Sequence, residues 1–100
     1  ACDIRLAVPG AKFFYPVMKL GFLPQPSDPA RLATLIGPAR AKMILMAGAK
    51  ITAQEALDWG LIECISAPED LLQDAHAFAA DACAAKPEHV AAIKRLVAPE

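Results

Sequence analysis

The sequence predicts an α/β fold, in which three short strands and about five helices are mixed along the chain rather than grouped by type. Residues 3–8 show the alternation that is typical of strands, and residues 61–66 are also predicted to form a short strand. Helical spacing of apolar residues begins at Pro29 and is longest between Pro68 and Ala85. Prolines and glycines separate these segments, so each element is expected to be short.

The first 16 residues predict two strands. Residues 3–8 place Ile4, Leu6 and Val8 on one face and Asp3, Arg5 and Ala7 on the other. Pro9-Gly10 ends this strand, and a second extended segment begins near Lys12. Phe13, Phe14 and Tyr15 favour extended structure up to Pro16.

The stretch from Ala11 to Leu32 connects that second strand to a helix through a turn rich in proline. Four prolines exclude a continuous helix here, and Gly21 permits a bend. Asp28 is expected to cap the helix, because its carboxylate can accept hydrogen bonds from unpaired amides, and Pro29 suits the first helical position. A strand and a helix N-terminus that meet form either a ligand site or plain scaffolding.

Local signals set the expected bounds of the later elements. Gly37 ends one helix, and Pro38 opens another that Gly48 is expected to cap. Thr52 and Glu55 have the spacing of a capping box for a helix that ends at Gly60. After the strand at residues 61–66, a long helix begins at Pro68 and carries an apolar stripe of Leu71, Leu72, Ala75, Phe78, Ala79 and Ala82. Pro87 precedes a final helix bearing Val90, Ile93 and Val97.

Composition narrows the class of protein. A content of 56% apolar and 21% charged residues is apolar for 100 residues, so some apolar surface is expected to meet another segment or subunit. The net charge of −1 indicates neither nucleic acid nor an anionic membrane as a partner, and no run is long enough to span a bilayer. Three cysteines without CxxC spacing are expected to be free thiols in a reducing cytoplasm. The chain starts at Ala1, so we expect it to be a piece of a longer protein.

The common local signatures of catalysis are missing from the sequence. It has no phosphate loop, no GxGxxG, no GxSxG and no HExxH. His76 and His89 lack partners at ligand spacing, so no metal site is expected.

The order and spacing of many individually weak positions resemble the enoyl-CoA hydratase/isomerase (crotonase) family. The resemblance covers essentially all 100 residues and corresponds to the C-terminal portion of the family. It begins with residues 1–7 and continues through Pro16, Leu20-Gly21, Pro24, Arg31-Leu32, Ile36-Gly37, Leu45–Gly48, Ile51, Ala53, Glu55-Ala56, Gly60-Leu61, Lys86-Pro87 and Lys94.

The resemblance implies part of a β-β-α spiral followed by C-terminal helices. Residues 1–67 would form the C-terminal part of the spiral core with a wall of the acyl-CoA pocket, and residues 68–100 a helical region for subunit contacts. It further implies a homotrimer or hexamer that takes a CoA thioester as substrate without another cofactor. Family members stabilise a thioester enolate with two backbone amides, from segments that would precede Ala1. This chain alone is therefore expected to lack half a site.

One position departs from the family's hydratases. Where they carry a catalytic glutamate after the proline equivalent to Pro16, this chain has Val17, which cannot transfer a proton. Hydration by two glutamates is therefore not expected, and the catalytic residue is unknown, with Asp28 a candidate acid or base. The resemblance places substrate against Pro16, Val17, Leu20, Gly21 and Pro24. Lys94 is a candidate for CoA phosphates, although a cation in a last helical turn also has a structural role.

Three readings of function remain open from the sequence. The first is an acyl-CoA enzyme with chemistry other than two-glutamate hydration, such as isomerisation, decarboxylation or thioester hydrolysis. The second is a non-catalytic CoA-binding or assembly module of the same fold. The third is an unrelated small helical binding domain, which requires that the β-β-α spiral be absent.

Overall fold

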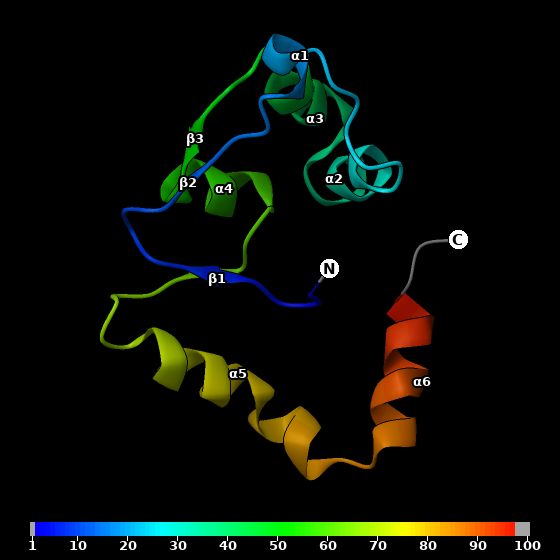
Figure 1. Cartoon of the computed structure of the whole chain (residues 1–100). Coiled ribbons are helices and arrows are strands. Elements are labelled where there is room, and N and C mark those ends of the chain that lie inside the picture. The colour runs from blue at the N-terminus through cyan, green and yellow to red at the C-terminus, as the bar shows by residue number, and fades with distance from the viewer. Residues whose placement is uncertain (1, 98–100) are drawn as a thin grey trace.

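The structure is a computed structural model and describes residues 2–97 of the chain. It is a mixed α/β fold, as predicted (Figure 1). In chain order its elements are β1 (Leu6–Ala7), β2 (Lys12–Phe13), α1 (Val17–Leu20), α2 (Asp28–Ile36), α3 (Pro38–Leu45), β3 (Ile51–Thr52), α4 (Ala53–Trp59), β4 (Cys64–Ile65), α5 (Leu71–Ala84) and α6 (Pro87–Val97).

Two small sheets bring distant parts of the chain together. Strand β1 pairs in parallel with β4, with Leu6 opposite Cys64. Strand β2 pairs antiparallel with β3, with Phe13 opposite Ile51. Because each pair is only two residues long, packing between helices must supply most of the stability.

The core lies where α2, α3 and α4 meet these strands. Ala56 and Ile51 are its most enclosed members, with 0% and 2% of their surface exposed. The buried apolar cluster consists of Ala7, Ile36, Ala41, Ile44, Ile51, Ala56 and Ile62. Gly60 ends α4 at a φ of 89°, and a Cβ atom there would lie 3.0 Å from the Leu35 carbonyl oxygen. Glycine is therefore required both for the backbone conformation and for the close approach of α2.

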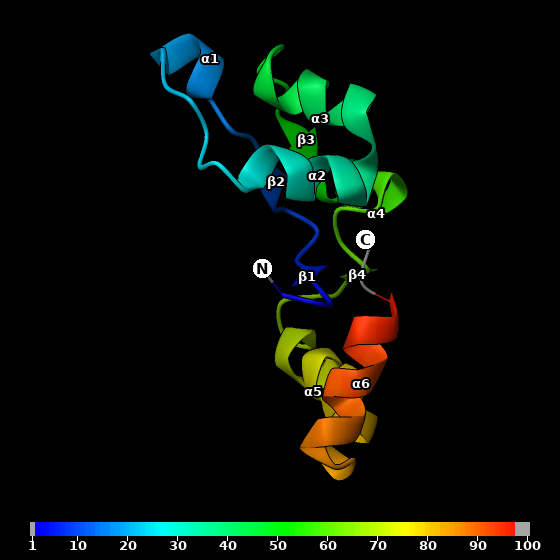
Figure 2. The same cartoon turned by 90° about the vertical axis from the view of Figure 1, so that its right-hand side faces the viewer.

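The molecule is elongated because α5 and α6 leave this core. Figures 1 and 2 show them on one side of β1, with α2, α3 and α4 on the other. The extents of 45 × 36 × 20 Å and a radius of gyration of 15.5 Å reflect that arrangement. A compact chain of this length has a radius of gyration of about 13 Å. Neither α5 nor α6 has a buried residue, and within residues 2–97 the apolar stripe predicted on the long helix is at most half-buried.

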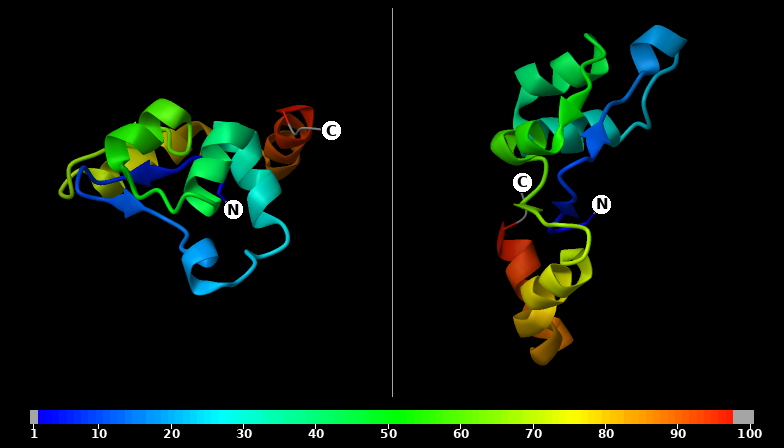
Figure 3. Two further views of the ribbon diagram at one scale, coloured as in Figure 1. Left: turned by 90° about the horizontal axis from the view of Figure 1, so that it is seen from above. Right: turned by 90° about the vertical axis from the view of Figure 1, so that its left-hand side faces the viewer.

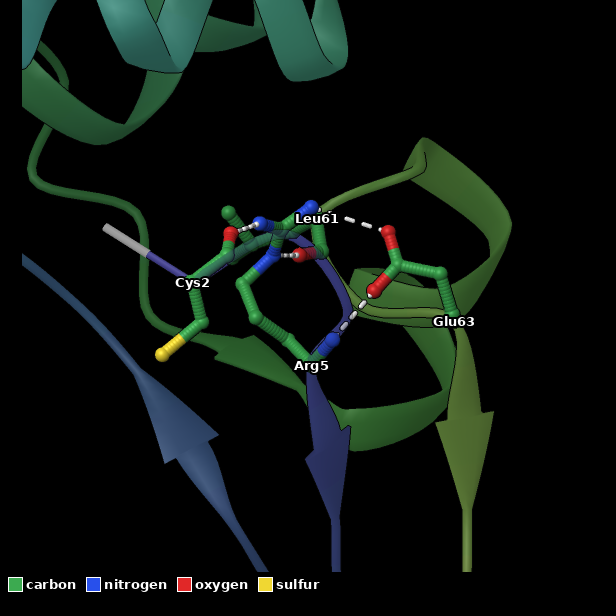
Figure 4. Close-up of polar contacts among 4 residues, drawn as sticks. All are labelled: Cys2, Arg5, Leu61 and Glu63. Carbon is green, nitrogen blue, oxygen red and sulfur yellow. Dashed lines mark hydrogen bonds and ion pairs between the residues drawn. The ribbon is translucent and has the colours of Figure 1, made fainter. Parts of the chain in front are cut away.

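Two polar clusters hold the first strand and α5 in place. The Arg5 guanidinium donates to the carbonyl oxygens of Leu61 and Cys2 and pairs with the Glu63 carboxylate at 2.8 Å (Figure 4). The Glu63 carboxylate also accepts from the Arg5 backbone amide at 2.6 Å. At the other cluster, the buried Ser66 hydroxyl donates to the Asp74 carboxylate at 2.6 Å. This second bond ties the first turn of α5 to the end of β4.

On the first strand, the face that carries Ala7 is buried more deeply than the face that carries Ile4, Leu6 and Val8. Ala7 is buried, whereas Ile4 is exposed and Leu6 and Val8 are half-buried. Burial on that side is possible because Arg5, on the same face as Ala7, satisfies its charge with Glu63 and backbone carbonyls rather than with water.

Several predicted boundaries were wrong by a few residues. Asp28 is the first residue of α2 and caps nothing, because its carboxylate is bonded to Tyr15 instead. Helix α3 ends at Leu45 rather than at Gly48, and α5 begins at Leu71, after a turn that starts at Pro68. Strand β3 was not predicted. The Thr52–Glu55 capping box and the left-handed Gly60 are confirmed.

Candidate functional site

The segment between β2 and α2 projects from the rest of the fold, as Figures 2 and 3 show for α1. Pro16 precedes one short helical turn, α1, which the sequence analysis had treated as part of a proline-rich turn. Gly21 ends it in the left-handed conformation with a φ of 74°, and the Phe22 amide donates to the Val17 carbonyl oxygen at 2.9 Å. Glycine makes this tight closure possible.

The predicted substrate-binding residues all lie on this projecting segment. Val17, Pro16 and Pro24 are half-buried, whereas Leu20 and Gly21 are exposed. Their exposed apolar neighbours are Met18, Phe22 and Leu23. The segment therefore presents apolar side chains outward instead of packing them on the core.

A hydrogen bond closes the base of this segment. The Tyr15 hydroxyl donates to Asp28 Oδ2 at 2.8 Å, and the Gln25 amide donates to the Tyr15 oxygen at 3.4 Å. Tyr15 follows β2, and Asp28 opens α2, so the bond joins the two elements between which the segment is inserted. Asp28 is the one acid or base candidate predicted from sequence. Its carboxylate accepts a hydrogen bond from the Tyr15 hydroxyl and not from helix amides.

A surface hollow of about 330 Å³ adjoins this bond. We call it the Tyr15 hollow; it is lined by Tyr15, Asp28, Arg31, Leu32, Leu35 and Leu45. A second hollow of about 290 Å³ lies beside it and shares Tyr15 and Leu32. Of the predicted site residues only Asp28 lines either of these two hollows; Pro16, Val17, Leu20, Gly21 and Pro24 do not.

The chemistry of the Tyr15 hollow is that of an apolar pocket with one polar end. Three leucines supply apolar wall, while Tyr15 and Asp28 supply a hydroxyl donor and a carboxylate acceptor. Arg31 adds a positive charge to the lining. The leucines can accept an apolar part of a ligand, and the Tyr15 hydroxyl and the Asp28 carboxylate can exchange a proton with a polar or acidic part of it.

Tyr15 was not predicted as a site residue, because its sequence context indicates only extended structure. No local signal singles out Tyr15, because its partner Asp28 lies 13 residues later in the chain.

The Lys94 ammonium lies far along the chain from this hollow and pairs with Asp3 Oδ2 at 2.9 Å. Both side chains are largely exposed, so the pair contributes little to stability. The pair connects α6 with the segment before β1. Among residues 2–97 no three His, Cys, Asp or Glu side chains are grouped to hold a metal ion. No helix in that range is long and apolar enough to cross a membrane.

Comparison with known proteins identifies the family. The family model described as enoyl-CoA hydratase/isomerase matches residues 1–99. The chain belongs to the enoyl-CoA hydratase/isomerase family. The resemblance drawn from the sequence is thereby confirmed, and an unrelated helical domain is excluded.

Relatives within the enoyl-CoA hydratase/isomerase family are longer than this chain. It is 33% identical over 96 residues to a carnitinyl-CoA dehydratase of Salmonella arizonae, covering 96% of this chain and 37% of the relative. It is 40% identical over 73 residues to a crotonyl-CoA hydratase of Syntrophomonas wolfei, covering 73% and 28%. The chain thus spans 37% and 28% of the lengths of these two relatives.

The solved structures of the family share this fold. A crystal structure of an enoyl-CoA hydratase from Mycobacterium paratuberculosis matches with a TM-score of 0.84 at 29% identity, covering 92% of this chain and 41% of that one. The predicted crotonase-like architecture is therefore confirmed for the portion of the family that this chain represents.

Proposed function

We propose that the full-length protein is an acyl-CoA-processing enzyme that stabilises a thioester enolate and does not hydrate by two glutamates. The observation that carries the proposal is membership of the family over residues 1–99, together with Val17 at the position that the resemblance assigns to a catalytic glutamate. A valine has no proton to give or take, so lyase chemistry by hydration is disfavoured and isomerase, decarboxylase or thioesterase chemistry is favoured.

The substrate would lie against the projecting segment, with Pro16, Val17, Leu20, Gly21 and Pro24 as the pocket wall. This assignment is supported by the exposed apolar side chains of the segment, which could contact the acyl chains of fatty acid metabolism. Asp28 is the proposed acid or base, because it lines a hollow that can accept an apolar group. The CoA thioester is itself the substrate, and we propose no further cofactor.

A panel of short and medium acyl-CoA thioesters tests this function. We expect the full-length protein to bind at least one of them and to convert it, measured by calorimetry and by chromatography of the products. Absence of both binding and turnover across the panel contradicts the proposal.

The second candidate is a non-catalytic CoA-binding or assembly module, and the loss of the carboxylate at Val17 favours it. Val17→Glu separates the two candidates. If the rest of the pocket is intact, this variant gains hydratase activity on crotonyl-CoA, measured by loss of the conjugated thioester absorbance. Robust turnover of any acyl-CoA by the unaltered protein contradicts the second candidate.

Residues 68–100 are proposed to form subunit contacts in a homotrimer or hexamer, while residues 1–67 form the core with the pocket wall. The support is the exposure of apolar side chains on α5 and α6, including Leu72, Phe78 and Ile93. Phe78→Glu is expected to lower the molar mass measured by light scattering. Met43→Glu, at a similarly exposed site on α3, is the control. An unchanged oligomer in the Phe78 variant contradicts this role.

Two smaller proposals complete the assignment. Lys94 would meet the CoA phosphates once its exposed pair with Asp3 opens, and Lys94→Ala is then expected to weaken CoA binding several-fold. The three free cysteines support a reducing, cytoplasmic location. Fractionation of cells that produce the full-length protein tests the location.

A further inference from the structure

We infer that Tyr15 and Asp28 together carry the proton of the reaction, with the Tyr15 hydroxyl as the catalytic group that touches substrate and Asp28 as the proton store behind it. The inference rests on the proposed acyl-CoA function and names two residues that would supply the proton transfer of which Val17 is incapable. It starts from one contact, the 2.8 Å hydrogen bond from the Tyr15 hydroxyl to Asp28 Oδ2.

The hydrogen bonding of the Tyr15 oxygen leaves room for substrate. A phenol oxygen has one proton and two lone pairs. The proton goes to Asp28, and the Gln25 amide takes one lone pair at 3.4 Å. The remaining lone pair can accept a proton from a ligand in the adjoining hollow, which Tyr15 itself lines.

The Tyr15 hollow suits a short or medium acyl group. Its volume of about 330 Å³ is at the lower end of the range of about 300–1,000 Å³ found for ligand pockets. Leu32, Leu35 and Leu45 add apolar side chains to the lining that contains the hydroxyl and the carboxylate. Arg31, in the same lining, favours a ligand that develops negative charge, as a thioester enolate does.

The proton transfer balances without water or another reactant. The C–H bond next to the thioester breaks, its electron pair stays on the substrate as the enolate, and its proton passes to the Tyr15 oxygen. In the same step the original Tyr15 proton passes to Asp28, so the phenol stays neutral and the carboxylate becomes a carboxylic acid. A phenolate is avoided, which matters because it would lie 2.8 Å from a carboxylate of the same sign.

The reverse transfer to a different carbon completes an isomerisation. The enolate takes the stored proton at its γ-carbon, the Tyr15 hydroxyl is re-formed from Asp28, and the double bond has moved by one position. One proton carrier is enough for this reaction, whereas hydration must both activate water and protonate carbon. The pair therefore favours isomerisation among the reactions left open by Val17.

The test uses the full-length protein with 3-hexenoyl-CoA as the probe and follows its conversion to 2-hexenoyl-CoA by absorbance. We expect Tyr15→Phe and Asp28→Asn each to lower kcat at least 100-fold with KM changed less than threefold, as general acid-base groups typically contribute about 10²–10⁴-fold. Asp28→Glu, which keeps the carboxylate, is expected to recover part of kcat.

Asp58→Asn is the matched control, because it removes the same charge from an exposed carboxylate on α4 that accepts only from Gln54. It is expected to leave kcat unchanged. Retention of kcat by Tyr15→Phe or Asp28→Asn overturns the inference but leaves the proposed function standing. Parallel loss of acyl-CoA binding and of thermal stability overturns it too, since the bond would then only hold the segment closed. No binding or turnover of any acyl-CoA by the unaltered protein overturns both.

Discussion

The core formed by β3 and the helices α2, α3 and α4 differs from the helices α5 and α6 in how deeply its apolar side chains are buried. The first region encloses Ile51 and Ala56 almost completely, whereas Leu72 on α5 is 72% exposed and Leu96 on α6 is 85% exposed. Both regions have apolar patterns in sequence, yet only the core encloses its apolar side chains within residues 2–97. The difference teaches that an apolar stripe on a helix predicts burial of that face. It does not predict whether the same chain or another chain buries it.

The largest expected effect comes from a pair of identical substitutions, one in each region. Ile51→Ala removes a side chain that is 2% exposed and is expected to cost about 2–5 kcal/mol of unfolding free energy. Ile93→Ala, at a side chain that is 49% exposed, is expected to cost less than about 1 kcal/mol in dissociated protein. Urea unfolding followed by circular dichroism measures both. Equal losses would mean that α6 is buried as deeply as the core.

The link between the two regions gives the next effect. Ser66→Ala removes the hydroxyl that donates to Asp74 and is expected to cost about 1.5–3 kcal/mol, because the bond is to a charged group and the hydroxyl is buried. Hydrogen exchange should then quicken in α5 more than in α4. Thr34→Val is the control, since its hydroxyl bonds only to the exposed turn of its own helix. Uniform acceleration in both helices would contradict a local link.

A smaller effect is expected where the first strand is held. Arg5→Lys keeps the charge but loses the planar fork that reaches Leu61, Cys2 and Glu63 together. We expect a loss of about 1–2 kcal/mol from two hydrogen bonds. Lys94→Arg, at an exposed ion pair, should be neutral by the same unfolding measurement. A neutral Arg5→Lys would show that a point charge alone holds β1.

The smallest effect tests a purely local signal within the core region. Thr52→Ala removes the N-cap of α4, because the Thr52 hydroxyl accepts a hydrogen bond from the Glu55 amide at 3.1 Å. The expected loss of unfolding free energy is about 1 kcal/mol. Thr52→Ser keeps the hydroxyl and should recover most of the melting temperature. Failure of serine to do so would assign the loss to the threonine methyl group instead.

Local chemistry explains which features could be predicted from sequence. The capping box of Thr52 and Glu55 and the left-handed Gly60 depend on residues within a few positions, so they were predicted correctly. The β-β-α spiral was predicted only from the family resemblance, because no single local pattern in the sequence indicates it.

Features that depend on distant residues were missed. The sequence left open which face of the first strand packs on the core, because the Glu63 carboxylate that pairs with Arg5 on the face of Ala7 lies 58 residues later. Asp28 had every property of an N-cap, but the structure gives it Tyr15, 13 residues earlier. The Tyr15–Asp28 bond lies within the Ala11–Leu32 stretch that the sequence singled out, but the bond itself could be seen only in the folded chain.

The parallel pairing of β1 with β4 also has a consequence for the order of folding. Leu6 pairs with Cys64, so β1 cannot be completed until the intervening helices have formed and brought the two strands together. During synthesis on the ribosome, the first strand must wait, unpaired, until β4 has emerged. The unpaired strand is only two residues long and is preceded by the charged Arg5. Both features disfavour aggregation through its exposed edge.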